Sequence, residues 1–190
     1  MSDFRARNKH EKQFEAAVIA AFADVPTTDG KVDDHGLEKL RKSLKTRLVA
    51  PVQATIDDAV DQVCEDYKID ETPKEVKGKI GVDADDYANS LANEIVANTQ
   101  TAAVQSADFP DIVAKLFSSA RAGVIGVTEV TALHSAIIKA LALASMIDVQ
   151  LIWHTSGDDN VCEDCEAKDG MLTEVVGEPP EHPNCNCWIE

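Results

Sequence analysis

The chain has 190 residues, of which 44 % are hydrophobic and 5 % aromatic, and its formal net charge at pH 7 is −16. This length suits one ordinary domain or a helical body with a small appendage, and the hydrophobic content excludes an acidic disordered protein. The negative charge argues against nucleic-acid binding by the chain as a whole. Residues 1–12 are charged throughout and no run reaches the ~18 apolar residues of a membrane helix, so we expect no signal peptide and no membrane contact.

Two helices are predicted in the N-terminal third of the chain. Residues 4–24 carry one apolar stripe at steps of three and four, and the polar turn after Pro26 ends the pattern. A longer helix, 34–66, has Pro51 in its middle, where we expect a kink or a division. Its apolar positions recur at the same steps: Leu37, Leu40, Leu44, Leu48, Val52, Ile56, Val60 and Val63.

The densest basic cluster lies on this second helix and consists of Lys39, Arg41, Lys42, Lys45 and Arg47. A solvated charged face is the interpretation we favour. Contact with DNA or with an acidic partner is the alternative, and in so acidic a chain such DNA contact is expected to be weak.

Residues 69–81 contain Pro73, Gly78 and Gly81 and are predicted to form a linker within a helical body that spans 1–119. A helix is expected from residue 82 to about 107, followed by a short amphipathic helix that ends near Gly123. The next helix is expected from about 127 to 147, with Gly126 or Thr128 as its cap.

Residues 149–155 and 171–176 have the β-branched and aromatic composition of strands, and the segment between and after them is rich in soft metal ligands. It reads C-E-D-C from Cys162 and H-P-N-C-N-C from His182. We expect one zinc ion bound by Cys162, Cys165, His182 and Cys187, with Cys185 as the alternative to Cys187. Disulfides or reduced thiols remain open alternatives. The fold class that follows is mainly α: a helical body with a small α+β C-terminal module, 120–190, whose short β-ribbon the Cys/His cluster staples.

The C-terminal third resembles a known family. The segments R-A-G-V-I-G-V-T-E-V, W-H-T-S-G-D-D-N-V-C-E-D-C-E-A-K-D-G and P-P-E-H-P-N-C-N-C are similar in order and spacing to the C-terminal module of the phage Mu F-like minor head (head morphogenesis) proteins. The resemblance covers roughly residues 120–188. Val127 and Asn186 stand where the family pattern has arginines, which puts any phosphate or carboxylate contact made by those arginines in doubt. The matching positions are Ile125, Thr128, Glu129, Trp153, Asp158, Cys162, Cys165, Asp169, Gly170, Pro179, Pro180, His182, Pro183, Asn184, Cys185 and Cys187.

This resemblance implies a virion structural protein that takes part in head assembly or in DNA packaging and delivery. It implies portal or capsid proteins of the same phage as partners, more than one copy per virion, and a location in the head or portal region after synthesis in the host cytoplasm. In this interpretation Trp153 packs in the module core, Asp169-Gly170 makes a turn, and Thr128 and Glu129 anchor the module to its helix. We expect no enzymatic activity.

Other functions fit the residues less well. A zinc-dependent hydrolase or nuclease needs an open coordination position, which a four-ligand zinc site does not leave. A zinc deaminase needs H-x-E followed by P-C-x-x-C, whereas Pro183-Asn184 follows His182 and the C-x2-C pair comes first. A redox role is disfavoured because Glu163, Asp164 and Glu166 surround the first two cysteines and raise thiol pKa values. A DNA-binding head protein is the remaining alternative.

Overall fold

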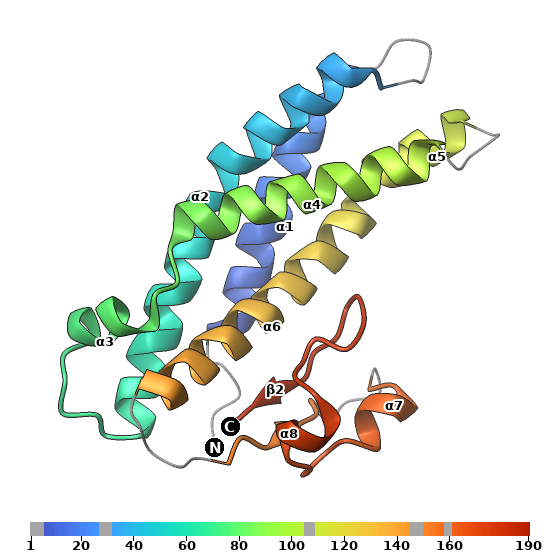
Figure 1. Ribbon diagram of the computed structural model, residues 1–190. Coiled ribbons are helices and arrows are strands. Elements are labelled where there is room, and N and C mark those ends of the chain that lie inside the picture. The colour runs from blue at the N-terminus through green and yellow to red at the C-terminus, as the bar shows by residue number, and fades with distance from the viewer. Residues whose placement is uncertain (1–5, 27–31, 105–108, 145–149, 158–160) are drawn as a thin grey trace.

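The protein is mainly α-helical, with a small mixed module at its C-terminal end (Figure 1). The structure is a computed structural model that describes residues 6–26, 32–104, 109–144, 150–157 and 161–190. The helices of the body are α1 (Arg7–Ala23), α2 (Asp34–Asp66), α3 (Pro73–Ile80), α4 (Ala84–Val104), α5 (Phe109–Leu116) and α6 (Ser119–Ala144). Because α6, which falls in the predicted module 120–190, packs with the body, the word module refers below to the described residues after α6. These contain β1 (Trp153–His154), α7 (Glu163–Glu166), α8 (Thr173–Val176) and β2 (Trp188–Ile189). The predicted fold class is thereby confirmed.

The four long helices α1, α2, α4 and α6 pack side by side into a bundle (Figure 1). The leucine stripe of α2 is its centre: Leu40, Leu44 and Leu48 are fully buried, as their spacing of four residues on one helix face predicts. Pro51 does not divide α2, which runs unbroken from Asp34 to Asp66.

Helices α1 and α6 approach each other closely at Gly126. A Cβ atom at this position would lie 2.7 Å from the backbone oxygen of Glu11, so only glycine fits there. The expectation that Gly126 or Thr128 begins a helix near residue 127 is therefore wrong: α6 begins at Ser119, and Gly126 is a packing position inside it. The hydroxyl of Ser118 accepts a hydrogen bond from Arg121 N at 3.2 Å and so satisfies one backbone donor in the first turn of α6.

The segment expected to be a linker, 69–81, contains the helix α3. Thr72 and Glu75 form a capping box at its start, Pro73 occupies the first turn, and Gly81 ends it in the left-handed conformation with φ of 65°. The same proline and glycines that suggested a linker are thus boundary signals of a helix. Val76 and Ile80 are buried in the core of the bundle.

The ribbon of the module differs from the expected pair of strands. Trp153 and His154 pair antiparallel with Ile189 and Trp188, so the second strand lies at 188–189. The predicted strand over 171–176 is wrong, because the chain turns after Leu172 into the helix α8. Leu172 keeps an antiparallel bridge to Ile152, and the neighbouring backbone bonds run from Trp153 N to Met171 O and from Thr173 N to Leu151 O, each at 2.8 Å.

The stretch Ile112–Ala144 is long and apolar enough to cross a membrane by length and composition alone, and its most apolar window of 18 residues has a mean hydropathy of 1.4. Half of its most apolar window is buried inside the protein. Since α6 supplies Val130, Leu133 and Ile137 to the core, packing in the bundle accounts for this composition.

Candidate metal centre

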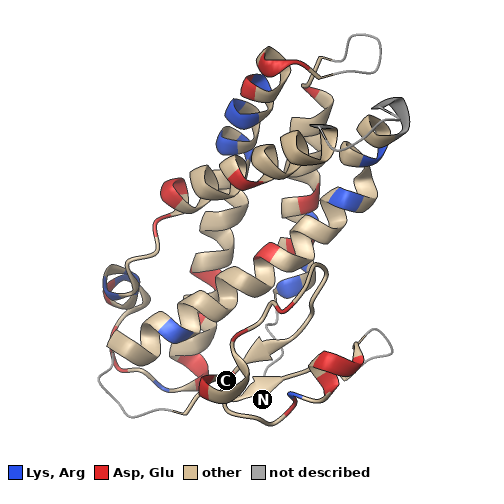
Figure 2. Cartoon of the chain, turned by 45° about the vertical axis from the view of Figure 1, so that its right-hand side comes forward, with Lys and Arg blue, Asp and Glu red and all other residues tan. Residues whose placement is uncertain are grey.

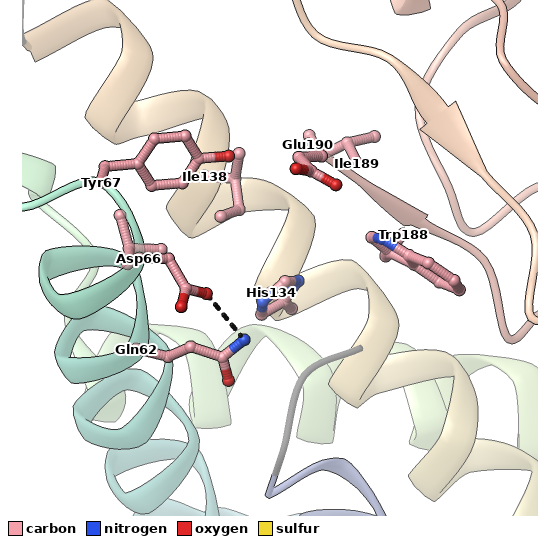
Figure 3. Close-up of a pocket in the computed structure, with 9 residues that line it drawn as sticks. Gln62, Asp66, Tyr67, His134, Ile138, Trp188, Ile189 and Glu190 are labelled. Atoms are coloured by element: carbon pink, nitrogen blue, oxygen red, sulfur yellow. Dashed lines mark hydrogen bonds between the residues drawn. The ribbon is translucent and has the colours of Figure 1, made fainter. Parts of the chain in front are cut away.

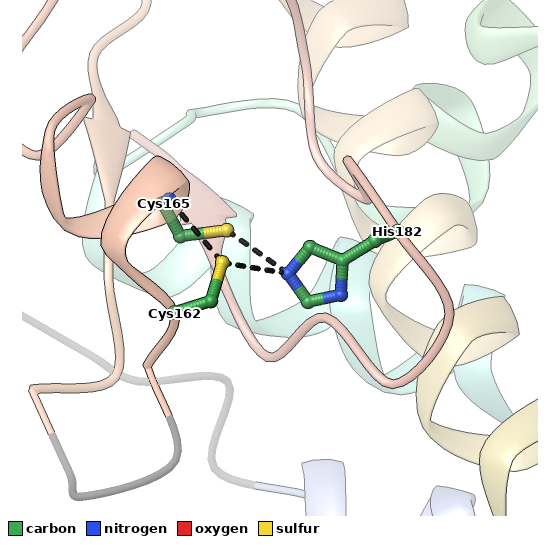
Figure 4. Close-up of side chains that lie close together, drawn as sticks. All are labelled: Cys162, Cys165 and His182. Carbon is green, nitrogen blue, oxygen red and sulfur yellow. Dashed lines mark hydrogen bonds between the residues drawn. The ribbon is translucent and has the colours of Figure 1, made fainter.

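The first two candidate sulfur ligands, Cys162 and Cys165, come from one turn of chain at α7 (Figure 4). Cys162 is the N-cap of this short helix, and its Sγ accepts a hydrogen bond from the backbone N–H of Cys165 at 3.4 Å. A C-x2-C pair at a helix start brings both sulfur atoms to the same side of the turn, as zinc sites with this spacing require.

His182 faces both sulfur atoms from the loop that precedes β2 (Figure 4). Its Nε2 lies 3.1 Å from Cys162 Sγ and 3.3 Å from Cys165 Sγ. Its Nδ1 lies 2.9 Å from the carbonyl oxygen of Pro183. Because that oxygen can only accept, Nδ1 is assigned the proton, and the lone pair of Nε2 points at the sulfurs, as in a metal-binding histidine.

Cys185 and Cys187 complete a second group around Cys165, and all three cysteines of this group are buried. The Sγ atoms of Cys165 and Cys185 are 3.9 Å apart. For comparison, the ligand atoms of a tetrahedral zinc site are separated by about 3.8 Å for two sulfurs and about 3.5 Å for sulfur and nitrogen, from Zn–S and Zn–N bond lengths of about 2.3 and 2.0 Å. The two groups share Cys165, and each has the ligand atoms to hold a metal ion.

The thiols of this cluster differ in how readily they ionise. A hydrogen bond from the Cys187 thiol lowers the pKa of Cys185 to about 5, despite burial. Burial raises the pKa of Cys165 to about 12, and the bond to Cys185 raises the pKa of Cys187. Thiolates packed this closely repel one another, and a divalent cation would remove that repulsion. All five cysteines, including Cys64 on α2, are free thiols in this structure.

The residues around the cluster fix it within the module. Trp153 is fully buried against Cys165, Cys185 and Cys187, and Lys168 Nζ lies 5.1 Å from the centre of its ring. Asp169 accepts a hydrogen bond from Thr155 N at 2.9 Å, and Gly170, with φ of 75°, donates one to Trp153 O at 2.8 Å. The Asp169-Gly170 turn therefore joins α7 to the ribbon. Trp188 is half-buried and stacks on His154, with ring centres 5.7 Å apart.

Thr128 and Glu129, both expected to anchor the module, have different partners: Thr128 contacts the module, and Glu129 contacts another helix of the bundle. Thr128 accepts a hydrogen bond from Asn184 N at 2.9 Å, so it contacts the loop that carries the last three candidate ligands. Glu129 instead accepts a hydrogen bond from the phenol of Tyr87 on α4 at 3.0 Å and joins two helices of the bundle. Burial raises the pKa of Glu129 to about 7, although this hydrogen bond lowers it.

The basic cluster lies on the first half of α2 (Figure 2) and is partly neutralised by acidic side chains of the same chain. Glu38 pairs with Arg41 and lies 3.7 Å from Lys42, and Asp24 pairs with Arg47 at 2.9 Å. Lys39 and Lys45 are exposed. Partial neutralisation fits a solvated face, and DNA or partner contact through Lys39, Arg41, Lys42, Lys45 and Arg47 stays a hypothesis.

A cavity of about 190 Å³ lies between the end of α2, α6 and β2 (Figure 3). Its walls include Asp66, Tyr67, Ile138, Trp188 and Glu190. His134, which also lines it, has its pKa lowered to about 4 by burial and by nearby Arg7, so its imidazole is neutral at pH 7. The cavity lies at the junction between the bundle and the module, and its lining contains none of the site residues predicted from the sequence.

Sequence reasoning missed Arg7 and Thr131, which hold the ligand-bearing loop from the bundle side. No spacing rule marks one arginine in the charged first turn of α1, or one threonine of α6, as a contact of a distant loop. Comparison of this chain with protein-family models, with curated proteins and with solved structures finds no match.

Proposed function

We propose that this protein is a structural component of a phage head, in which the Cys/His cluster closes a docking module on a helical body. The observation that carries this proposal is the order and spacing of the cluster residues, which resemble the Mu F-like minor head proteins. The convergence of Cys162, Cys165 and His182 on one point supports it. Such a site serves stability: four protein ligands leave zinc no open position for chemistry.

The metal that fits these donors best is zinc, because thiolates and imidazole in tetrahedral arrangement are its preferred ligands. Cys162, Cys165 and His182 supply three positions in this proposal. Cys185 and Cys187, our sequence-based choice, compete for the fourth position, and the sulfur atoms of Cys165, Cys185 and Cys187 all lie within 4.8 Å of one another.

Zinc stoichiometry and a free-thiol count, measured on protein purified under reducing conditions, test the metal part of this proposal. We expect one zinc per chain and thiols that react fully only after chelation. Cys185→Ser and Cys187→Ser identify the fourth ligand, since the substitution that lowers zinc affinity more marks it. Absence of zinc together with fewer free thiols than the five encoded in the sequence would show that disulfides, and not a metal ion, cross-link the cluster.

The proposed partners are portal and capsid proteins of the same phage, with more than one copy of this protein in the head or portal region of each virion. Co-expression with the portal and capsid proteins encoded in the same genome, followed by affinity purification, tests this. We expect co-purification that Cys165→Ser weakens, because the substitution removes the metal site of the docking module. Failure to co-purify with either protein would overturn the assignment to the head.

A further inference from the structure

The loop that carries His182, Cys185 and Cys187 is held by side chains of the bundle at three consecutive residues. Asn184 N donates to Thr128 Oγ1 at 2.9 Å, and Cys185 O accepts from Thr131 Oγ1 at 2.9 Å. Asn186 O accepts from Arg7 Nη1 at 3.2 Å. Each of these backbone atoms lies within two residues of candidate metal ligands, so the bundle fixes the positions of the ligands themselves.

The hydrogen-bonding capacities of the two threonines match this role. The Thr131 hydroxyl donates to Cys185 O and accepts a hydrogen bond from Arg7 Nη2. The Thr128 hydroxyl accepts from Asn184 N and donates to Val124 O of its own helix at 2.8 Å. A hydroxyl has one proton to give, and in both residues that proton is used.

Burial makes these contacts costly to break. Arg7 is 8 % exposed, Thr131 2 % and Cys185 1 %. Arg7 also pairs with Glu11 on its own helix at 2.9 Å, and the close approach of α1 to α6 at Gly126 brings this part of α1 against α6. A buried guanidinium that loses its acceptors keeps the desolvation cost without the compensating bonds, so displacement of the loop penalises the docking of α1.

We propose that Arg7 and Thr131 are positioning residues of the metal site, and that metal binding and the docking of α1 on α6 stabilise each other. This inference rests on the metal binding proposed above. Groups that orient metal ligands from outside the coordination sphere change metal affinity by about 10- to 100-fold. Coupling between two equilibria is reciprocal. The free energy that the Arg7–Thr131 contact adds to metal binding is therefore the same as the free energy that bound metal adds to the docking of α1 on α6.

The test uses the full chain with zinc alone as ligand and a chromophoric chelator as competitor. Thr131→Val keeps the shape of the side chain but removes the hydroxyl, and we expect about 10-fold weaker zinc binding. Thr131→Ser keeps the hydroxyl and should restore the affinity. Thr46→Val is the matched control on the exposed face of α2, where the hydroxyl only bonds its own helix at Lys42 O, and it should bind as the unsubstituted protein does.

Hydrogen exchange on the unsubstituted protein provides a second readout that needs no variant. We expect zinc to slow exchange of the amides of α1 as well as those of 162–190, while α4, which lies away from the loop in the bundle, changes little. Equal zinc affinity of Thr131→Val and the unsubstituted protein, or protection confined to 162–190, would overturn the coupling while leaving the metal site in place. Absence of zinc binding by the unsubstituted protein would overturn the metal site and the coupling with it.

Discussion

In the helical bundle a continuous cluster of buried hydrophobic side chains runs through α1, α2, α3, α4 and α6 and includes Ile189 of β2. The module's own buried cluster consists of Trp153 and the three cysteines Cys165, Cys185 and Cys187. Burial of apolar area can stabilise the first region without help. The second region has a ribbon of two residues per strand, and such a ribbon is barely stable alone. One chain therefore combines a region stabilised by hydrophobic burial with a small region that a metal cross-link or docking on the bundle would stabilise.

The largest expected effect is the loss of the metal from the module. Cys165→Ser removes the one cysteine that both ligand groups share, and we expect zinc content to fall from one per chain to none. Apparent zinc binding contributes about 10–16 kcal/mol to small zinc-folded peptides, so the near-ultraviolet dichroism of the module should collapse while most far-ultraviolet helical signal stays.

The matched control for this variant is Cys64→Ser. Cys64 is a half-buried thiol on α2, outside both ligand groups. The Cys64→Ser variant should retain one zinc per chain and the near-ultraviolet spectrum of the unsubstituted protein. Full zinc content in Cys165→Ser would contradict the assignment of Cys165 as the central ligand.

A substitution in the bundle should have the opposite pattern. Leu44 is fully buried in α2, and Leu44→Ala should lower the free energy of unfolding by about 2–5 kcal/mol through lost burial and the cavity left behind. Zinc stoichiometry should stay at one per chain. Urea unfolding measures the loss, with exposed Lys45→Ala as control; a loss as small as that of the control would show that this part of α2 is not packed as described.

The pH dependence of stability should report Glu129. Burial raises its pKa to about 7 from 4.5, so the folded state binds its proton more tightly than the unfolded state. The stability that this proton contributes is complete below pH 4.5 and is lost as the pH rises through 7. Relative to Glu129→Gln, which cannot ionise, the protein should lose about 2 kcal/mol between pH 5.5 and 8.5. Parallel stability curves for the two proteins would contradict the burial of this carboxyl group between α4 and α6.

The smallest effect is expected at the start of α3. Thr72→Ala removes the hydroxyl that caps Glu75 N and should cost about 1 kcal/mol in the free energy of unfolding. Glu75→Gln keeps the reciprocal bond of the capping box, because glutamine also serves in that position, and should change stability less. A larger loss in Glu75→Gln than in Thr72→Ala would assign the stabilisation to charge instead.

The bundle was largely predictable because its signals are local. The steps of three and four between Leu37 and Val63 mark one buried face of a helix whatever it packs against. The capping box at Thr72 and Glu75, with Pro73 between them, was a readable signal for α3 that the glycines at 78 and 81 obscured. The role of Gly126 was misjudged because it depends on a tertiary contact: the backbone of Glu11, against which Gly126 packs, lies more than 100 positions earlier in the sequence.

The candidate site was predictable in composition but not in arrangement. The spacing around Cys162 and His182 predicts a cluster of soft ligands, and the structure brings these side chains together. The partner of β1 could not be chosen from composition. Thr173 and Val175 are β-branched, as strand residues often are, yet Trp188 and Ile189 are the residues that pair with β1. Arg7 and Thr131 depend on tertiary contact alone.

The bond between Arg7 and Asn186 joins residues 179 positions apart, and this separation has a consequence for the order of events during synthesis. Helix α1 leaves the ribosome early, when its partner on α6 and the loop that it holds do not yet exist. Contacts of such long range form late, because the chain between them must be closed first. The loop that carries His182, Cys185 and Cys187 therefore reaches its final position only after Asn186 has emerged, so the proposed metal site can be completed only late in synthesis.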